Sequence, residues 1–451
     1  MVILEDMMEA YYDCRRHKRR TRSAVEFEMN YESELIRLTE EVNNRTYHPG
    51  TSICFVVKYP RYREVFAARF RDRIIHHYIA LKLEPLFEKI FTDRTFNCRK
   101  DKGQLYGITM LREDIRHCSE DYTRDCWAMK LDLKGFFMSI NKELIAKKVD
   151  DFISRNYHGE DKQDLRYLCE TVIMHCPEKD CERRSPIEMW NHLPKNKSLF
   201  TNGEDLGLAI GNLFSQLFAN FLLNDLDHYI MDELGFKHVG RYVDDMYIID
   251  KDKNKMLQAV PEIRSLLETL NLRLNEDKFY IQHYSKGIKF IGSVVKGNRV
   301  YTGNRSVYKF ASSVDRLNDA ATSHDALDIV NSINSYLGLL QHTQSYAIRR
   351  KVLSEVKGRA YRFVYVKGHF EALKVKKKYI TRYKIMTNIA RTDSERKRKV
   401  TPPVTIRTTR LDTSLVKKLS KNGYVVVSYA DGVYNMDVYR NELKPRKNLR
   451  K

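Results

Sequence analysis

The chain has 451 residues, and 42% of them are hydrophobic, which is enough for a sizeable core. Lys and Arg number 80 against 59 Asp and Glu, giving a formal net charge of +21, and this favours polyanions because binding releases condensed counterions. Nucleic acid is therefore the expected partner, and a basic surface without a specific partner is the alternative. No stretch of the sequence approaches the roughly 18 to 20 apolar residues of a membrane span, so we expect no membrane partner.

Hydrophobic periodicity and turn residues predict alternating helices and strands along the chain. The predicted helices are 3–16, 31–43, 72–91 (kinked or broken at Pro85), 140–155, 211–234, 253–272 (with Pro261 in its first turn) and a helical stretch from 305 to 387. The predicted strands are a hairpin of 52–57 and 63–67 turned through 59–61, a buried strand 126–132, a strand pair 239–250 and a hairpin of 288–295 with 299–302. Residues 176–205 predict a long loop.

The eight cysteines show no repeated pair spacing, which is typical of reduced thiols rather than a disulfide framework. His175, Cys176 and Cys181 form only a weak zinc pattern, because no second ligand pair accompanies them. The N-terminal segment has acids within its apolar part and basic residues after it, the wrong order for a secretory signal. We therefore expect a cytoplasmic protein.

Three acidic residues interrupt apolar strands. Asp132 follows the predicted strand 126–132, and Asp244 and Asp245 lie inside the strand pair 239–250. Adjacent acids in a hydrophobic strand repel each other in a poorly solvated site, and a bound cation removes that penalty. A solvated turn is the alternative, but the flanking Tyr, Val, Met and Ile are not turn residues. Carboxylates at the ends of neighbouring strands suit Mg²⁺, which supports phosphoryl transfer.

At this point the sequence resembles the reverse transcriptases. The Y-x-D-D box at 242–245 resembles the palm motif C of that family, and the matching segments occur in family order from about residue 30 to 390. The other segments that resemble family motifs are 131–140 (motif A), 211–216 (motif B), 274–278 (motif D) and 287–292 (the primer grip). The resemblance implies an α+β right-hand polymerase fold that makes DNA on an RNA template.

The resemblance also implies roles for single residues. Asp132, Asp244 and Asp245 would be catalytic and would hold two Mg²⁺ ions, for which Mn²⁺ could substitute. The residues implied in dNTP binding are Lys58, Arg61, Arg63, Phe137, Ile210, Gly211, Gln216 and Lys278, and those implied in nucleic-acid binding are Arg99, Lys100 and Lys102. Cationic side chains suit phosphate oxygens, although each of them could equally be a solvated surface residue.

Phe137 lies where the family places an aromatic ring under the sugar of the incoming nucleotide. A ring there collides with a 2′-hydroxyl, which favours deoxynucleotides and disfavours an RNA-dependent RNA polymerase, as does Val243 in the Y-x-D-D box. Its neighbour Phe136 is the alternative, and either ring could be a core residue.

Motif B departs from the retroviral pattern. It has Ile210 before the glycine and Gln216 after the serine, as in the reverse transcriptases of bacterial diversity-generating retroelements and of some related defence-associated enzymes. We expect the former, with anti-phage defence as the alternative reading. Because Ile210 cannot hydrogen-bond the nucleotide, we hypothesise relaxed base discrimination.

The resemblance divides the chain into five predicted parts. They are N-terminal helices and fingers (1–125), a palm (126–303) with a fingers or palm insert (151–204), a helical thumb (304–390), a linker (391–403) and a small basic appendage (404–451) with a strand at 424–429. The expected partners are a structured template RNA, the cDNA product and dNTPs, with an accessory protein or a second copy of the chain left open. A catalytically silent RNA-binding scaffold is the alternative of another class.

Overall fold

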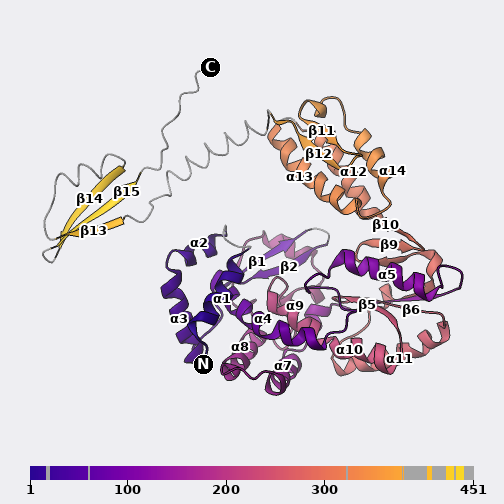
Figure 1. Ribbon diagram of the computed structural model, residues 1–451, viewed down its shortest axis with the longest axis horizontal. Helices are drawn as coiled ribbons and strands as arrows, with labels where there is room; N and C mark the ends of the chain where they lie inside the picture. The colour runs from indigo at the N-terminus through magenta and orange to yellow at the C-terminus, as the bar shows by residue number, and fades with distance from the viewer. Residues whose placement is uncertain are drawn as a thin grey trace. The chain divides into compact units, whose positions relative to one another are not determined.

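The computed structural model describes residues 1–16, 21–58, 61–320, 323–377 and 379, and the backbone of three strands between 404 and 440 (Figure 1). The chain separates into two compact units, one made of Met1–Ala311 and Tyr336–Lys351 and the other of Ser312–Ser335 and Val352–Lys451. None of the described helices is both long enough and apolar enough to cross a membrane.

A four-stranded antiparallel sheet, the central sheet, lies in the first unit (Figure 1). Its strands, in spatial order, are β5 (His238–Tyr242), β6 (Asp245–Asp250), β3 (Trp127–Asp132) and β7 (Tyr280–His283). Side chains alternate between the two faces of a strand, and the two faces here belong to different cores. Met129 and Ile248 lie in the larger core cluster, whereas Ala128 and Ile249 lie in a second one. Both faces are therefore buried, which fixes the strand register.

Helices supply most of the larger core. They are α1 (Leu4–Arg15), α2 (Arg22–Glu28), α3 (Tyr31–Asn43), α4 (Phe70–Ile90), the short α6 (Phe136–Ser139), α7 (Lys142–Asn156), α8 (Lys162–Met174), α9 (Leu213–Leu222), α10 (Asn224–His228) and α11 (Lys253–Thr269). The second core packs α5 (Gln104–Cys118) and the meander of β8 (Ile288–Phe290), β9 (Ser293–Lys296) and β10 (Arg299–Thr302) against the sheet.

A smaller sheet consists of β1 (Ser52–Val57), β2 (Arg63–Ala67) and β4 (Cys181–Arg183). Buried Glu64 on β2 accepts hydrogen bonds from Trp190 Nε1 at 2.7 Å, Ser198 Oγ at 2.7 Å and the Leu199 amide at 2.8 Å. Three donors satisfy a carboxylate that is 1% exposed, so Glu64 fastens the segment around residues 187–201 to this sheet. That segment contains the 3₁₀ turns Ile187–His192, Lys195–Lys197 and Leu199–Thr201.

The remaining elements lie after α11 in the chain. They are 3₁₀ turns at Glu276–Lys278, Tyr284–Lys286 and Ala360–Arg362, helices α12 (Asn304–Asn318), α13 (Ser323–Leu340) and α14 (Tyr346–Ser354), the hairpin β11 (Val364–Lys367) and β12 (Ala372–Val375), and the three-stranded sheet of β13 (Val404–Thr408), β15 (Val433–Arg440) and β14 (Gly423–Ala430). The predicted linker 391–403 lies outside the described residues, as do the turn residues Tyr59 and Pro60.

Most predicted elements are confirmed, and several details differ, among them the predicted strand 288–295, which is divided into β8 and β9. Helix α4 is not broken at Pro85, because a single lost hydrogen bond is outweighed by the buried apolar face around it. Pro261 lies in the middle of α11, because Asp252 caps the amides of Asn254 and Lys255 and starts the helix earlier. Residues 211–234 form α9, α10 and a π-helical turn at Tyr229–Glu233 in place of one helix.

The other two differences are short elements inside segments that were expected to be uniform. The predicted loop 176–205 contains β4 and three 3₁₀ turns, which depend on pairing with β1 and on Glu64. The helical stretch 305–387 includes the hairpin β11–β12, which alternates too briefly for a period of two to show in the sequence.

Candidate active site

Strand register brings the three predicted aspartates to one end of the central sheet. Asp132 on β3 is paired directly with Asp245 on β6, and Asp245 is also paired with Tyr242 on β5. Asp244 and Val243 form the turn between β5 and β6. Residues paired across antiparallel strands have Cβ atoms about 5 Å apart, so the acids of two segments more than 100 residues apart meet at one place.

Asp132 is held from the segment that follows α11. Its Oδ1 accepts a 3.0 Å hydrogen bond from Asn275 Nδ2, and its Oδ2 lies 2.5 Å from Lys278 Nζ. The backbone amide of Asn275 also donates to the Asp132 carbonyl at 2.7 Å. The Asp132 carboxylate is buried, whereas the Lys278 side chain is 44% exposed and can move away from it.

Asp245 has a different and more permanent partner. Its Oδ1 pairs with the ammonium group of Lys130, which is 5% exposed, and its Oδ2 accepts from the Ile291 amide at 3.3 Å. Lys130 also donates to the carbonyls of Leu131 and Met246 at 3.1 and 3.0 Å. Burial lowers the pKa of Lys130 to about 7, and the charges of Asp132 and Asp244 oppose that shift. The Asp245 carboxylate therefore points toward the buried ammonium group of Lys130.

Asp244 carries the uncompensated charge of the site. Burial raises the pKa of its carboxyl, the negative charge of Asp132 raises it further, and Lys278 and Arg63 oppose the shift. Two carboxylates that disfavour each other's ionisation in a poorly solvated place are stabilised by a cation between them.

These features fit a divalent cation held by Asp132 and Asp244. Mg²⁺ needs only one or two protein carboxylates and completes its shell with water and substrate phosphates. Lys278 supplies the positive charge next to Asp132 in this structure, and its exposed side chain can yield that place. No group of three or more His, Cys, Asp or Glu side chains among the described residues is arranged to hold a metal, because Asp245 is turned to Lys130. Among the described residues, His175, Cys176 and Cys181 likewise form no group that could hold a zinc ion.

Cations from the β1–β2 hairpin lie near the acids. Arg61 and Arg63 are exposed, and so is Lys58. Burial lowers the pKa of Lys197, and the charges of Arg61, Lys278 and Arg63 lower it further, while Asp132 opposes the shift. Lys197 lies on the segment that Glu64 fastens. It is therefore close enough to Arg61, Arg63 and Asp132 for their charges to act on it.

The predicted sugar and base contacts lie on one apolar cluster. Phe136 is buried in the larger core, whereas Phe137 is half-buried and also touches a small cluster that includes Phe66, Met138 and Leu199. Ile210 packs against the same small cluster. Of the two adjacent rings, Phe137 is therefore the one with an accessible face.

Gly211 lies where the motif B loop meets β2. The Phe66 amide donates to the Ile210 carbonyl at 2.9 Å, and Gly211 has φ +119°. A Cβ at Gly211 would lie 2.6 Å from the Phe66 carbonyl oxygen and 2.8 Å from Val65 Cγ1. Only glycine allows this approach. The half-buried Gln216 accepts from the Cys98 thiol at 2.5 Å.

The basic turn predicted to contact nucleic acid is partly engaged within the protein. Arg99 pairs with Glu88 at 2.7 Å, donates to the carbonyls of Thr92 and Thr95, and has a side chain that is 4% exposed. Lys102 pairs with Asp93 at 3.1 Å, and Lys100 is exposed. Arg99 thus anchors the chain segment before it, and a nucleic-acid contact stays a prediction for all three residues.

Four residues next to the site were missed by the sequence reading: Lys130, Lys197, Asn97 and Arg241. Lys130 and Arg241 lie close to the recognised acids in the sequence. A charged residue inside a strand predicted to be buried is unusual, and this could have indicated that both residues belong to the site. Lys197 and Asn97 reach the site only through tertiary contacts.

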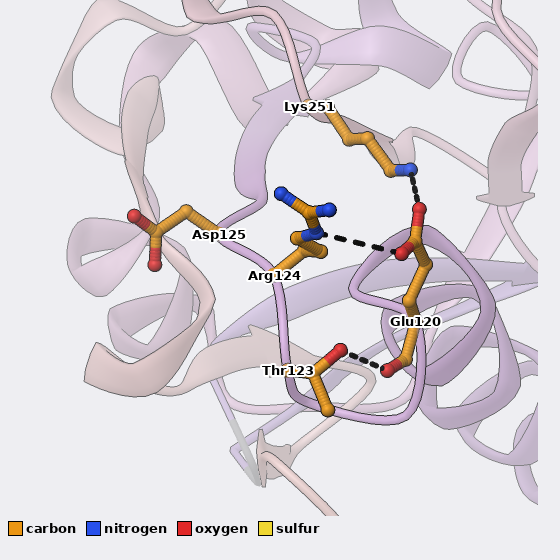
Figure 2. A pocket seen from close by; sticks show the side chains of 5 residues that line it. All are labelled: Glu120, Thr123, Arg124, Asp125 and Lys251. Carbon is orange, nitrogen blue, oxygen red and sulfur yellow. Dashed lines mark hydrogen bonds and ion pairs between the residues drawn. The ribbon is translucent and has the colours of Figure 1, made fainter.

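A polar pocket of about 430 Å³ lies at the opposite end of β6 (Figure 2). Glu120 pairs there with Lys251 at 2.5 Å and with Arg124 at 3.6 Å, and Thr123 and Asp125 complete the lining. Its charges compensate one another, and none of the predicted site residues lines it. The pocket therefore has no part in the site at 132 and 244–245.

Residues 58–295, more than half of the chain, match the family model described as "Reverse transcriptase (RNA-dependent DNA polymerase)". The chain belongs to the reverse transcriptase family. This membership and the antiparallel sheet with its acids confirm the predicted right-hand polymerase fold. Divalent metal use is general among such domains.

Individual relatives of this reverse transcriptase are distant. Protein YkfC of Escherichia coli K12 is 25% identical over 255 residues, which are 49% of this chain and 60% of that protein. The chain thus spans less than two thirds of this curated relative. A Candida albicans telomerase structure with a fragment of telomeric RNA has 11% identity and a TM-score of 0.41, and the match covers 74% of this chain and 60% of that one. An apo telomerase from Candida tropicalis matches with 12% identity and the same TM-score of 0.41, covering 68% and 58% of the two chains.

Proposed function

We propose that this reverse transcriptase is an active RNA-directed DNA polymerase. The observation that carries the proposal is the meeting of Asp132 with Asp244 and Asp245 at one end of the central sheet, beside a movable cation, Lys278. A binding scaffold has no need of buried carboxylates that repel each other, whereas phosphoryl transfer does.

In the proposed reaction the 3′-hydroxyl of a primer attacks the α-phosphorus of a dNTP, and pyrophosphate leaves. Two Mg²⁺ ions, when bound, would activate the hydroxyl and neutralise the leaving group. Asp132 and Asp244 would hold them, and Asp245 would keep the turn in register through Lys130. Lys278 would leave Asp132 when the metals bind and donate a proton to pyrophosphate.

The triphosphate would lie among the cations of the β1–β2 hairpin. Arg61 and Arg63, with Lys58, supply donors for phosphate oxygens, and Lys197 adds a fourth cation from the segment that Glu64 holds. We assign residues 1–125 and the insert 151–204 to the fingers, the rest of 126–303 to the palm and 304–390 to the thumb of this polymerase.

Phe137 would select deoxynucleotides. Its half-buried ring lies against the cluster that Ile210 also contacts, so a 2′-hydroxyl would meet the ring. Phe137→Ala should therefore raise the efficiency of rNTP incorporation relative to dNTP incorporation by about tenfold or more. Phe136→Leu is the control, because that residue is buried and should change folding stability without changing the ratio.

Primer extension tests the activity. The purified chain should extend a DNA primer on an RNA template with dNTPs and Mg²⁺, and a chelator should stop it. Asp244→Asn should abolish extension while leaving the affinity for the template–primer within about twofold, because an isosteric amide keeps the shape but loses the charge that holds the metals. A wild-type chain that extends no primer, or an Asp244→Asn variant that retains the biological activity, would support the scaffold alternative.

For the biological role we propose mutagenic copying in a diversity-generating retroelement. Ile210 before the glycine and Gln216 after the serine support this reading. Sequencing the nucleic acid that copurifies with the chain tests it. cDNA that carries clustered substitutions relative to one RNA template would support it, whereas unmutated cDNA that appears only during phage infection would support the defence alternative.

A further inference from the structure

The turn between β5 and β6 holds a strained backbone. Val243 has φ +59°, in the left-handed region that a β-branched side chain rarely adopts. The next residue, Asp244, is one of the two proposed metal ligands, so the Val243 conformation sets where its carboxylate points. Strain of this kind persists only where the surrounding structure enforces it.

Both polar groups of Val243 are held by buried side chains. The Val243 amide donates to Asn97 Oδ1 at 2.8 Å, and the Val243 carbonyl accepts from Arg241 Nη1 at 3.2 Å. Asn97 and Arg241 are 2% and 1% exposed. Water scarcely reaches the Asn97 and Arg241 side chains, so both contacts hold Val243 from the protein interior.

Each of the two holding residues is itself fixed. Asn97 Nδ2 donates to Asn220 Oδ1 at 2.8 Å, and Asn220 Nδ2 donates to the Asn97 carbonyl at 3.0 Å. Arg241 donates to Asp227 from Nε at 2.7 Å and from Nη2 at 2.5 Å, and Thr95 Oγ1 donates to the same carboxylate at 2.8 Å. A satisfied network of this kind restricts each member to one geometry.

The segment that carries Asn97 is attached to the edge of the same sheet. Arg241 donates its amide to the Arg94 carbonyl at 2.8 Å, and the Phe96 amide donates to the Arg241 carbonyl at 2.9 Å. These bonds form a parallel β-bridge between Thr95 and Arg241 on the edge strand β5, and Asn97 lies two residues further along. Its side chain ends up beside the turn 146 residues further along the chain.

We propose that Asn97 is a positioning residue for catalysis: it locks Val243 in the left-handed conformation and so aims Asp244 at the metal site. The inference rests on the proposed polymerase function. Arg241 holds the carbonyl group of the same residue, but its loss would also leave Asp227 buried without a cation, so Asn97 gives the cleaner test.

The experiment compares Asn97→Ala in the full chain with the wild type and with Asn224→Ala. Asn224 is a matched control, because it is a 6% exposed asparagine on α10 whose Oδ1 has no partner among the described residues. Hydrogen–deuterium exchange on the metal-free proteins follows the peptide that spans the β5–β6 turn. Steady-state primer extension at varied Mg²⁺ gives kcat and the half-saturating metal concentration, and filter binding gives the template–primer Kd.

Asn97→Ala should increase deuterium uptake in the turn peptide while other peptides of the sheet stay unchanged. It should lower kcat by about tenfold or more and raise the half-saturating Mg²⁺ concentration several-fold, with the template–primer Kd within about twofold. Asn224→Ala should leave the uptake and the metal dependence unchanged. If the alanine protein does not fold, Asn97→Ser gives the same test, because its side chain is too short to reach the Val243 amide but keeps a polar group at the buried position.

Unchanged uptake at the turn, or an unchanged Mg²⁺ dependence in a folded Asn97 variant, would overturn the positioning role. So would a uniform rise in exchange across the whole sheet, which indicates a purely structural residue. A wild-type protein that extends no primer would instead contradict the proposed function, so the two failures are distinguishable.

Discussion

Lys278 Nζ lies 2.5 Å from Oδ2 of Asp132, so the proposed proton donor and the proposed metal ligand neutralise each other before substrate arrives. The pair is poised for exchange, because the Lys278 side chain is 44% exposed while that of Asp132 is 9% exposed. A metal ion can replace the lysine, and the freed ammonium group can then turn to the leaving pyrophosphate.

Lys278→Met should therefore lower kcat by about 100-fold, the typical contribution of a general acid, with little change in template–primer affinity. Single-nucleotide incorporation under pre-steady-state conditions measures the effect. Lys251→Ala is the control, because Lys251 follows β6 at the other end of the strand and pairs with Glu120 (Figure 2). Equal rates in the two variants would contradict a special role for Lys278.

The buried pair of Lys130 and Asp245 should matter for stability. Lys130→Met fills a similar volume but leaves Asp245 without its cation, and we expect the free energy of unfolding to fall by about 2 kcal/mol, since Asp245 is partly solvated. Urea denaturation measures the change. The double variant Lys130→Met with Asp245→Asn should recover part of the loss. A Lys130→Met protein as stable as the wild type would show that the pair contributes nothing.

Gly211→Ala should distort the contact between motif B and β2. The new Cβ would meet the Phe66 carbonyl oxygen, which cannot move without disturbing the hydrogen bond from the Phe66 amide to the Ile210 carbonyl. We expect the KM for dNTPs to rise about tenfold and the melting temperature to fall by several degrees. Gly203→Ala is the control, because a Cβ there meets nothing within 4 Å. Equal behaviour of the two alanine variants would count against the contact.

Ile210→Gln should make base selection stricter. Ile210 offers the incoming nucleotide no hydrogen bond, whereas a glutamine could add one, worth about 1 kcal/mol or roughly fivefold in selectivity. Misincorporation measured on a defined RNA template should fall by that factor, and Ile210→Leu should behave like the wild type. An unchanged error rate in the glutamine variant would remove Ile210 as the source of relaxed selection.

His76 predicts a pH dependence of stability. Burial lowers its pKa from 6.5 to about 3, and its ring packs against Phe214 of α9. The unfolded chain therefore binds this proton at a higher pH than the folded chain, so the stability present above pH 6.5 is lost as the pH falls toward 3. His76→Leu should lose less unfolding free energy between pH 6.5 and 4.5 in urea titrations. Parallel pH profiles of the variant and the wild type would contradict this.

The sequence predicted most of the central sheet and the place of its acids, because Asp132 ends one short strand and Asp244 lies in the turn between two others, and the apolar flanks of these strands fix their register. The same local signals could not show how the acids are supported. Asn97 meets Val243 and Arg241 meets Asp227 through contacts that depend on the folded sheet. Periodicity also failed where a tertiary contact decided an element.

Two elements illustrate that limit. The expected helix 211–234 is divided, and the division sets Asp227 against Arg241 on β5. The expected loop 176–205 gains its order from Glu64, which lies more than 100 residues away in the chain. Neither segment contains the residue that determines its structure. The Y-x-D-D box, in contrast, can be recognised from its own residues and their apolar neighbours.

The most direct test of the central claim is a single dTTP addition to a DNA primer annealed to an RNA template that presents adenine, compared between the wild type, Asp132→Asn and Asp244→Asn. The account predicts Mg²⁺-dependent addition by the wild type and a loss of about 1,000-fold or more in each variant, with template–primer binding retained. Addition by either variant at a rate near that of the wild type would contradict it.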